Sequence, residues 1–140
     1  MQRQEAIQLW ANRWRNLRAW GRELSEVQIE YRSRSEEVGS YSTGLAFPVR
    51  RRIVITHGSD MSDALACVLH ELAHLAVDGR EWHGRKWRLM FLTAVGEVTS
   101  RPLHGGEAWT YRLLQCAAED AVRAWWRASG FNRLWKMAKD

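Results

Sequence analysis

Cysteine is scarce in this chain. Cys67 and Cys116 are the only two among 140 residues, and no C-x-x-C pair occurs, which excludes a disulfide framework. Cys67 lies in an apolar run, where a buried thiol is expected. No segment has the composition of a linker or an internal repeat, and hydrophobic residues make up 46% of the chain. These features predict a single domain, residues 1–140, with a core of its own.

Long apolar runs are also missing. Residues 1–14 contain no apolar signal core. The longest apolar stretch, residues 64–77, is interrupted by His70, Glu71 and His74, and it is too short and too polar to span a bilayer. We therefore expect a soluble, cytoplasmic protein with no membrane partner.

Hydrophobic periodicity predicts the secondary structure. Spacings of three and four indicate helices, whereas strict alternation indicates half-buried strands. The resulting order is one helix, three strands, three helices and a short helical tail, which predicts an α+β domain. The predicted segments are helix 4–24, strands 27–32, 40–47 and 52–57, helices 61–77, 84–96 and 109–128, and the helical tail 131–139.

The predicted helix 61–77 carries an H-E-x-x-H motif, formed by His70, Glu71 and His74. Histidines four residues apart lie on one face of a helix, one turn from each other, so both can reach one metal ion. Glu71 is rotated by about 100° from His70, which suits it to hold a metal-bound water as a general base rather than to act as a ligand. Burial of these side chains without a cation would cost several kcal/mol, and this favours a metal site over a purely structural one.

A catalytic zinc site takes three protein ligands and leaves one position open. His83 is the predicted third ligand, because it follows the end of one helix and precedes the next, and the intervening loop can fold back. His57 and His104 are the competing candidates. Three neutral imidazoles favour zinc over magnesium or calcium, so we expect one Zn²⁺ per chain.

These residues resemble the SprT-like metallopeptidase family. In that family, H-E-x-x-H is followed by a loop, by H-G-x-x-[FW] at the start of a helix, and by a later glycine. In this chain the second motif is formed by His83, Gly84 and Trp87, and the later glycine is Gly96. The similarity extends over residues 21–104. It implies a small zincin-like α+β domain: an N-terminal helix, a three-stranded antiparallel or mixed sheet, a central zinc-binding helix and further C-terminal helices.

The resemblance divides the single domain into three parts. Residues 1–25 would form the N-terminal helix, residues 26–104 the zincin core, and residues 105–140 a C-terminal helical extension. Two departures from the family are visible: the loop between His74 and His83 is shorter than in many members, and the cysteine-built zinc ribbon is absent. Residues 107–140 are instead predicted to be helical and rich in tryptophan.

The function implied is a zinc-dependent metallopeptidase that hydrolyses peptide bonds in a protein or peptide substrate. Glu71 would activate a zinc-bound water, and a second group would stabilise the tetrahedral oxyanion. Tyr111, His104 and Arg101 are the candidates for that group. The strand 52–57 is a candidate to pair with an extended substrate by strand addition.

The alternative is a zinc-containing DNA- or protein-binding module without peptidase activity. Its supports are the net charge of +5, the basic run Arg50, Arg51 and Arg52, and a C-terminal segment that combines tryptophan with basic residues. The family's eukaryotic members act on proteins crosslinked to DNA, so DNA is a further candidate partner. Exposed Trp125, Trp126 or Trp135 would then stack on single strands.

Overall fold

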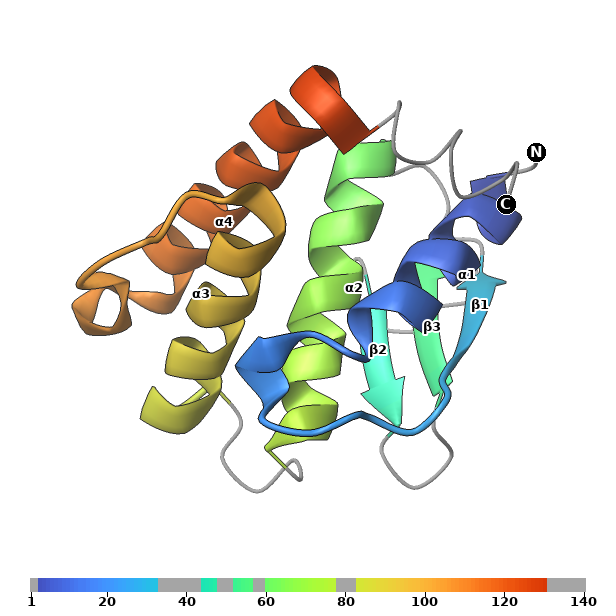
Figure 1. Ribbon diagram of the computed structural model, residues 1–140, viewed down its shortest axis with the longest axis horizontal. Coiled ribbons are helices and arrows are strands. Elements are labelled where there is room, and N and C mark those ends of the chain that lie inside the picture. The colour runs from blue at the N-terminus through green and yellow to red at the C-terminus, as the bar shows by residue number, and fades with distance from the viewer. Residues whose placement is uncertain (1–2, 33–43, 48–51, 57–59, 78–82, 131–140) are drawn as a thin grey trace.

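A computed structural model gives the fold, and it describes residues 3–32, 44–47, 52–56, 60–77 and 83–130. The regular elements appear in the order helix, three strands, three helices, with short helical turns between and after them (Figure 1). The α-helices and strands are α1 (Arg3–Trp14), β1 (Gln28–Arg32), β2 (Gly44–Phe47), β3 (Arg52–Thr56), α2 (Met61–Ala76), α3 (Arg85–Thr99) and α4 (Tyr111–Trp125). The short elements are the 3₁₀ turns η1 (Arg18–Trp20) and η3 (Gly106–Ala108) and the π-helical turn η4 (Trp126–Gly130).

Helix α2 is the centre of the molecule. It contacts α1, α3, α4, β2 and β3, with α3 and α4 on one side of it and the sheet with α1 on the other (Figure 1). Asp60 caps its N-terminus by accepting a hydrogen bond from the backbone N–H of Asp63 at 2.8 Å. The helix is apolar on nearly every side, and this is why it is buried along its whole length. The predicted helix 61–77 is confirmed.

The three strands form one mixed sheet in the order β1–β3–β2. Strand β1 pairs with β3 in parallel, and β2 pairs with β3 antiparallel. Ile29 and Ile53 are partners in the β1–β3 register and are both buried in the core, so one face of this pair is turned toward the helices. Strand β3 is therefore the central strand, with a neighbour on each edge.

The predicted α+β, zincin-like fold class is wrong. The four α-helices have 12, 16, 15 and 15 residues, whereas the strands have only 5, 4 and 5. The alternation of apolar and polar residues shows where strands occur. It does not show that strands this short form a sheet that covers only a small part of the core. The chain is a mostly helical domain in which a small sheet, with a single parallel pairing, covers one side of α2.

The first helix is shorter than predicted. Helix α1 ends at Trp14, and the chain turns through η1 to Gly21 at φ 73°. The indole N–H of Trp20 donates to the Trp14 carbonyl at 2.6 Å, and Glu97 accepts hydrogen bonds from the first two N–H groups of η1 at 3.0 and 2.9 Å. The helical spacing of apolar residues extends to Leu24 because the turn brings Trp20 and Leu24 back onto the same core.

Helix α3, in contrast, is longer than predicted, because Gly96 does not end it. The helix continues to Thr99 and stops at Ser100, which adopts a left-handed conformation at φ 57°. A Cβ at position 96 would lie 3.3 Å from the Cα of Pro102. The absence of a side chain at Gly96 thus allows the following segment to pack closely against α3.

Helix α4 joins the main core rather than forming a separate extension. Thr110 caps it by accepting a hydrogen bond from the N–H of Leu113 at 3.3 Å, so it begins two residues later than predicted. At its other end the Trp125 ring lies 5.2 Å from Trp10 and 5.9 Å from Trp14 between centroids. The predicted tail 131–139 lies outside the described residues. In the described part of the chain, no helix has the length and apolar character needed to cross a membrane.

The tryptophan cluster predicts a stability effect. Replacing Trp125 by Ala should lower the free energy of unfolding by about 3–5 kcal/mol, because it would leave a cavity where the indole ring now packs between α4 and α1. Leu113→Ala on the same helix is the matched control, since that side chain is 59% exposed, and it should change stability by about 0.5 kcal/mol or less. Urea unfolding followed by circular dichroism measures both. Equal losses in the two variants would contradict the structural role of the cluster.

Candidate metal centre

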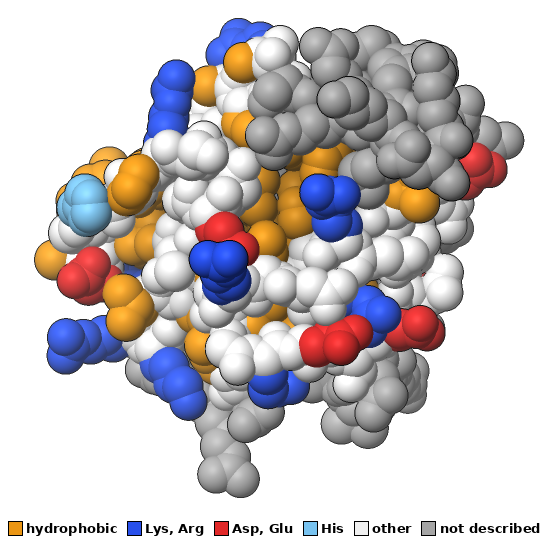
Figure 2. Space-filling model, viewed as in Figure 1, with side chains coloured by type: hydrophobic (Ala, Val, Ile, Leu, Met, Phe, Trp, Pro, Cys, Tyr) orange, Lys and Arg blue, Asp and Glu red, His pale blue; other side chains and the backbone are white. Residues whose placement is uncertain are grey.

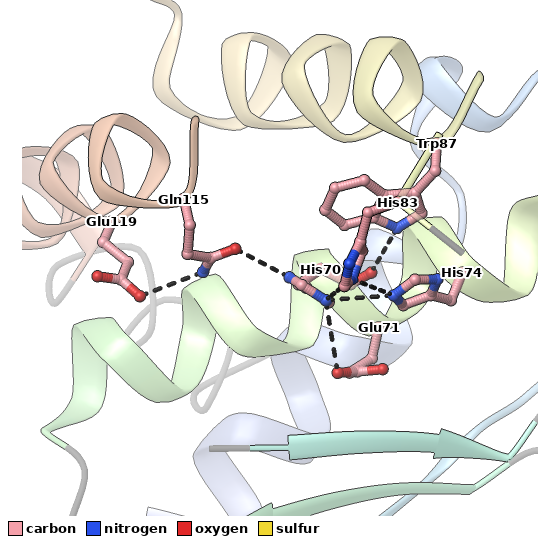
Figure 3. Close-up of polar contacts among 7 residues, drawn as sticks. All are labelled: His70, Glu71, His74, His83, Trp87, Gln115 and Glu119. Atoms are coloured by element: carbon pink, nitrogen blue, oxygen red, sulfur yellow. Dashed lines mark hydrogen bonds and ion pairs between the residues drawn. The ribbon is translucent and has the colours of Figure 1, made fainter. Parts of the chain in front are cut away.

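Two histidines of α2 point to the same place from successive turns. His70 and His74 are 8% and 6% exposed, and their ring centroids lie 5.0 Å apart. The geometry of the α-helix produces this placement locally, because a spacing of four residues returns the chain to the same face. The two rings lie on the side of α2 that faces α3 (Figure 3).

His83 reaches the same place from the start of α3. It immediately precedes Gly84, the N-cap of that helix, and its carbonyl accepts a hydrogen bond from Arg88 Nε at 2.8 Å. Its ring stacks on the ring of Tyr111 with a centroid distance of 4.1 Å and an interplanar angle of 17°. The backbone bond and the stacked ring hold His83 in a defined position from two sides.

The three Nε2 atoms form a nearly equilateral triangle. They are separated by 3.2 Å between His70 and His74, 3.1 Å between His74 and His83, and 3.2 Å between His83 and His70 (Figure 3). Ligand atoms at about 2.0–2.1 Å from a tetrahedral ion are about 3.3 Å apart, so the observed spacing suits a shared metal ion. The three histidines thus lie close enough to hold one metal ion.

Burial keeps these imidazoles neutral. It lowers the pKa of His70 to about 3 and the pKa values of His74 and His83 to about 4. A neutral imidazole has one nitrogen with a lone pair, and only that form binds a metal. If the lone pair of each ring is on Nε2, the three lone pairs face one another, and a cation at their centre would satisfy all three. The donor set fits a transition metal ion better than magnesium or calcium.

Trp87 forms one wall of the centre. Its ring lies 4.6 Å from His70, 5.0 Å from His74 and 4.6 Å from His83 between centroids, and it is fully buried. Its indole N–H donates to the His70 carbonyl at 3.3 Å. Phe91 stacks behind it at 4.9 Å. Rigid aromatic packing restricts the rotamers of the histidines, and this preorganises their nitrogens.

Glu71 lies beside the triangle without joining it. Its Oε1 is 3.9 Å from His70 Nε2, and its side chain is buried (Figure 3). Burial raises the pKa of Glu71 to about 8, so this carboxyl group is mostly protonated at neutral pH while no cation is bound. A metal ion held by the three histidines would lower that pKa again, because a nearby positive charge stabilises the carboxylate. A carboxyl group close to a metal centre but outside the ligand set can accept a proton from a water molecule there.

Comparison with known proteins adds no relative. No protein-family model, curated protein or solved structure matches this chain. The residues of the centre and their geometry are therefore what indicates a function.

Of the three oxyanion candidates, the structure brings Tyr111 to the centre. Besides stacking on His83, its ring lies 6.1 Å from that of His70. Burial and the nearby Glu71 raise the pKa of Tyr111 to about 12, so its hydroxyl keeps its proton. His104 is exposed and lines a separate cavity beside α3, and Arg101 is exposed on the segment that follows α3. His104 is also excluded as the third ligand by this position, while the competing His57 lies outside the described residues.

The residues proposed for nucleic acid are not assembled by the described structure. Arg50 and Arg51 lie outside the described residues, and only the backbone of Arg52 is described, in β3. On the visible face of Figure 2, the described basic side chains are interspersed with acidic ones. Trp125 is 7% exposed and packs against Trp10 and Trp14, so it lacks the exposure on which stacking with single strands was conditional.

One residue of the centre was missed by the sequence analysis. Gln115 of α4 places its Oε1 3.0 Å from His70 Nδ1, across a separation of 45 residues (Figure 3). No motif connects these two positions. The only local signal is Glu119, four residues later on the same helix, to which Gln115 Nε2 donates at 3.1 Å.

The geometry predicts tight binding of one divalent transition-metal ion. Titration with Co²⁺ should saturate at one equivalent and give the visible absorption of a tetrahedral complex, because three imidazoles and a solvent molecule complete four positions. The ion should also raise the melting temperature, by mass action on the folded state. The variant His70→Ala/His74→Ala should lose both effects, and His104→Ala should keep them. Full occupancy in the double variant would contradict the site.

Proposed function

We propose that this protein is a zinc-dependent metallopeptidase that resembles the SprT-like family in its motifs. The observation that carries the proposal is the triangle of Nε2 atoms beside the buried Glu71 carboxylate. A purely structural metal site is closed by four protein ligands and has no use for a base. Here the described residues supply three clustered ligands and, next to them, a carboxylate.

Zinc fits this donor set. It accepts neutral imidazole nitrogens in tetrahedral geometry, and three histidines leave one of its four positions open. When bound, zinc supplies a Lewis acid that polarises the substrate carbonyl and makes water more acidic. The buried aromatic wall formed by Trp87 and Phe91 limits solvent on one side of the centre, which strengthens electrostatic interactions there.

Glu71 performs the proton transfers in this proposal. Its carboxylate accepts a proton from the attacking water and then donates that proton to the leaving amine as the peptide C–N bond breaks. Glu71 therefore ends the reaction in the charge state in which it began. The position of Glu71, one residue after His70, turns its side chain away from the ligand triangle while keeping it close. The same helix therefore supplies both ligands and base.

Tyr111 is the proposed donor to the oxyanion. Its hydroxyl stays protonated at neutral pH, and its ring lies flat against His83. A hydroxyl held by a stacked ring is preorganised, and a donor of this kind stabilises the negative charge that develops on the carbonyl oxygen. The residue comes from α4, so the C-terminal helix would take part in catalysis.

The structure changes the expected route of the substrate. Strand β3 has β1 on one edge and β2 on the other, so an extended peptide cannot add to it. Within the described sheet, β2 is the outer strand on the side that contacts α2. We propose that a peptide substrate pairs with β2, because main-chain hydrogen bonds at a sheet edge bind extended segments of varied sequence.

The test of the base is Glu71→Gln. The amide keeps the size of the side chain but cannot accept the proton, so peptide hydrolysis should fall by at least ~10²–10⁴ while zinc stays bound. A library of peptides incubated with the zinc-loaded protein and analysed by mass spectrometry measures cleavage. Glu107→Gln, in the separate cavity beside α3, is the control and should cleave at the wild-type rate.

The same experiment distinguishes the alternative. A zinc-containing DNA- or protein-binding module would keep zinc in both variants and would cleave no peptide in any of them. Cleavage by Glu71→Gln at the wild-type rate would show that another group is the base.

The test of the oxyanion donor is Tyr111→Phe. This change keeps the ring on His83 and removes only the hydroxyl, so zinc affinity should be unchanged. Loss of one such donor typically lowers kcat by about 10²–10³. Steady-state kinetics on a cleaved peptide, with zinc occupancy measured in parallel, checks both expectations. A wild-type kcat would exclude Tyr111 from this role.

A further inference from the structure

Helix α4 connects to the metal centre through Gln115. The Gln115 side chain accepts a hydrogen bond from His70 Nδ1 with its Oε1 at 3.0 Å and donates from its Nε2 to Glu119 Oε1 at 3.1 Å (Figure 3). Gln115 and Glu119 are one helical turn apart and half-buried. The three side chains thus form a chain of hydrogen bonds that ends on the ring nitrogen of His70 opposite the ligand triangle.

The direction of each hydrogen bond in this chain follows from chemistry. The Glu119 carboxylate can only accept, so it selects the amide nitrogen of Gln115 and turns the amide oxygen toward His70. That oxygen can only accept as well, so Nδ1 of His70 must carry the hydrogen. A neutral imidazole has one N–H, and the lone pair is therefore left on Nε2, the atom that faces His74 and His83.

We infer that Gln115 is a positioning residue that fixes the metal-binding tautomer and ring orientation of His70, with Glu119 holding the Gln115 amide in the required orientation. The inference deepens the proposed function, on whose metal site it depends. In the absence of Gln115, a buried His70 could place its hydrogen on either nitrogen, and its Nε2–H form has no lone pair on the atom that faces His74 and His83. Partners of this kind typically contribute a factor of 10–100 to metal affinity.

Helices α4 and α2 are joined by two polar links. The polar connection through Gln115 is accompanied by a second one, in which Arg123 donates to Asp63 of α2 at 3.0 Å. The two links differ in what they contact on α2. Gln115 contacts His70 of the metal centre, whereas Arg123 forms a partly exposed ion pair with Asp63 in the first turn of the helix. Arg123 is therefore the matched control.

The test measures zinc affinity by competition with a chromophoric chelator in four variants. Gln115→Leu should bind zinc about 10–100-fold more weakly, because it cannot accept from Nδ1. Gln115→Glu keeps an acceptor oxygen and should bind within a few-fold of wild type. Glu119→Leu should weaken binding less than Gln115→Leu does. Arg123→Gln should leave the affinity unchanged, although it removes a link between the same two helices.

A second readout follows the tautomer directly. Two-dimensional NMR of ¹⁵N-labelled imidazoles in the zinc-free protein should show His70 with its hydrogen on Nδ1 in the wild type and in Gln115→Glu. In Gln115→Leu a fraction of His70 should move to the Nε2–H form. A merely structural role for Gln115 would change stability without changing the tautomer.

The outcomes separate this inference from the proposed function. Wild-type protein that binds no zinc overturns both. Zinc binding with unchanged affinity in Gln115→Leu, or equal losses in Gln115→Leu and Arg123→Gln, overturns the positioning role alone. Zinc binding that depends on Gln115 in a protein that cleaves no peptide supports the positioning role and overturns the peptidase.

Discussion

The convergence of three imidazole nitrogens on one point inside the protein is the constraint on which the rest of the structure depends. The three Nε2 atoms lie 3.1–3.2 Å apart, and a cation bound between them would satisfy a lone pair on each. Each nitrogen is held by a different device: the helical repeat of α2 for His74, the N-terminus of α3 for His83, and Gln115 for His70. Trp87 contacts all three rings and fills the space behind them.

The surrounding helices explain how such a centre can be rigid in a chain of this size. Helix α2 contacts every other α-helix, so the two ligands that it carries lie on the best-supported element of the fold. Helix α4 is anchored at its far end by Trp125 and presents Tyr111 and Gln115 to the centre at its near end. The segment that departs most from the family resemblance is therefore part of the site and not an appendage.

The fold class and the chemistry of the site are separate findings. The chain is mostly helical, with a small sheet that covers one side of α2. A site can nevertheless be interpreted from its own geometry, because reactivity depends on donors, distances and burial and not on the scaffold. In the activity that we propose, the triangle of imidazoles would hold the metal ion and the buried carboxyl group 3.9 Å from His70 Nε2 would serve as the base.

The sequence by itself determined what depends on neighbouring residues. The spacing of His70 and His74 placed them on one face of a predicted helix, and the helix stop before His83 allowed it to return, because backbone geometry alone governs both. Tertiary packing decided the rest. It ended the first helix at Trp14, where the Trp20 indole binds, and it placed β3 between two strands. It brought Tyr111 to the metal centre and left His104 and Arg101 away from it. It also buried Trp125 and placed Gln115 against His70, 45 residues away. Those contacts join segments far apart in the chain, and local periodicity contains no information about which of them will meet.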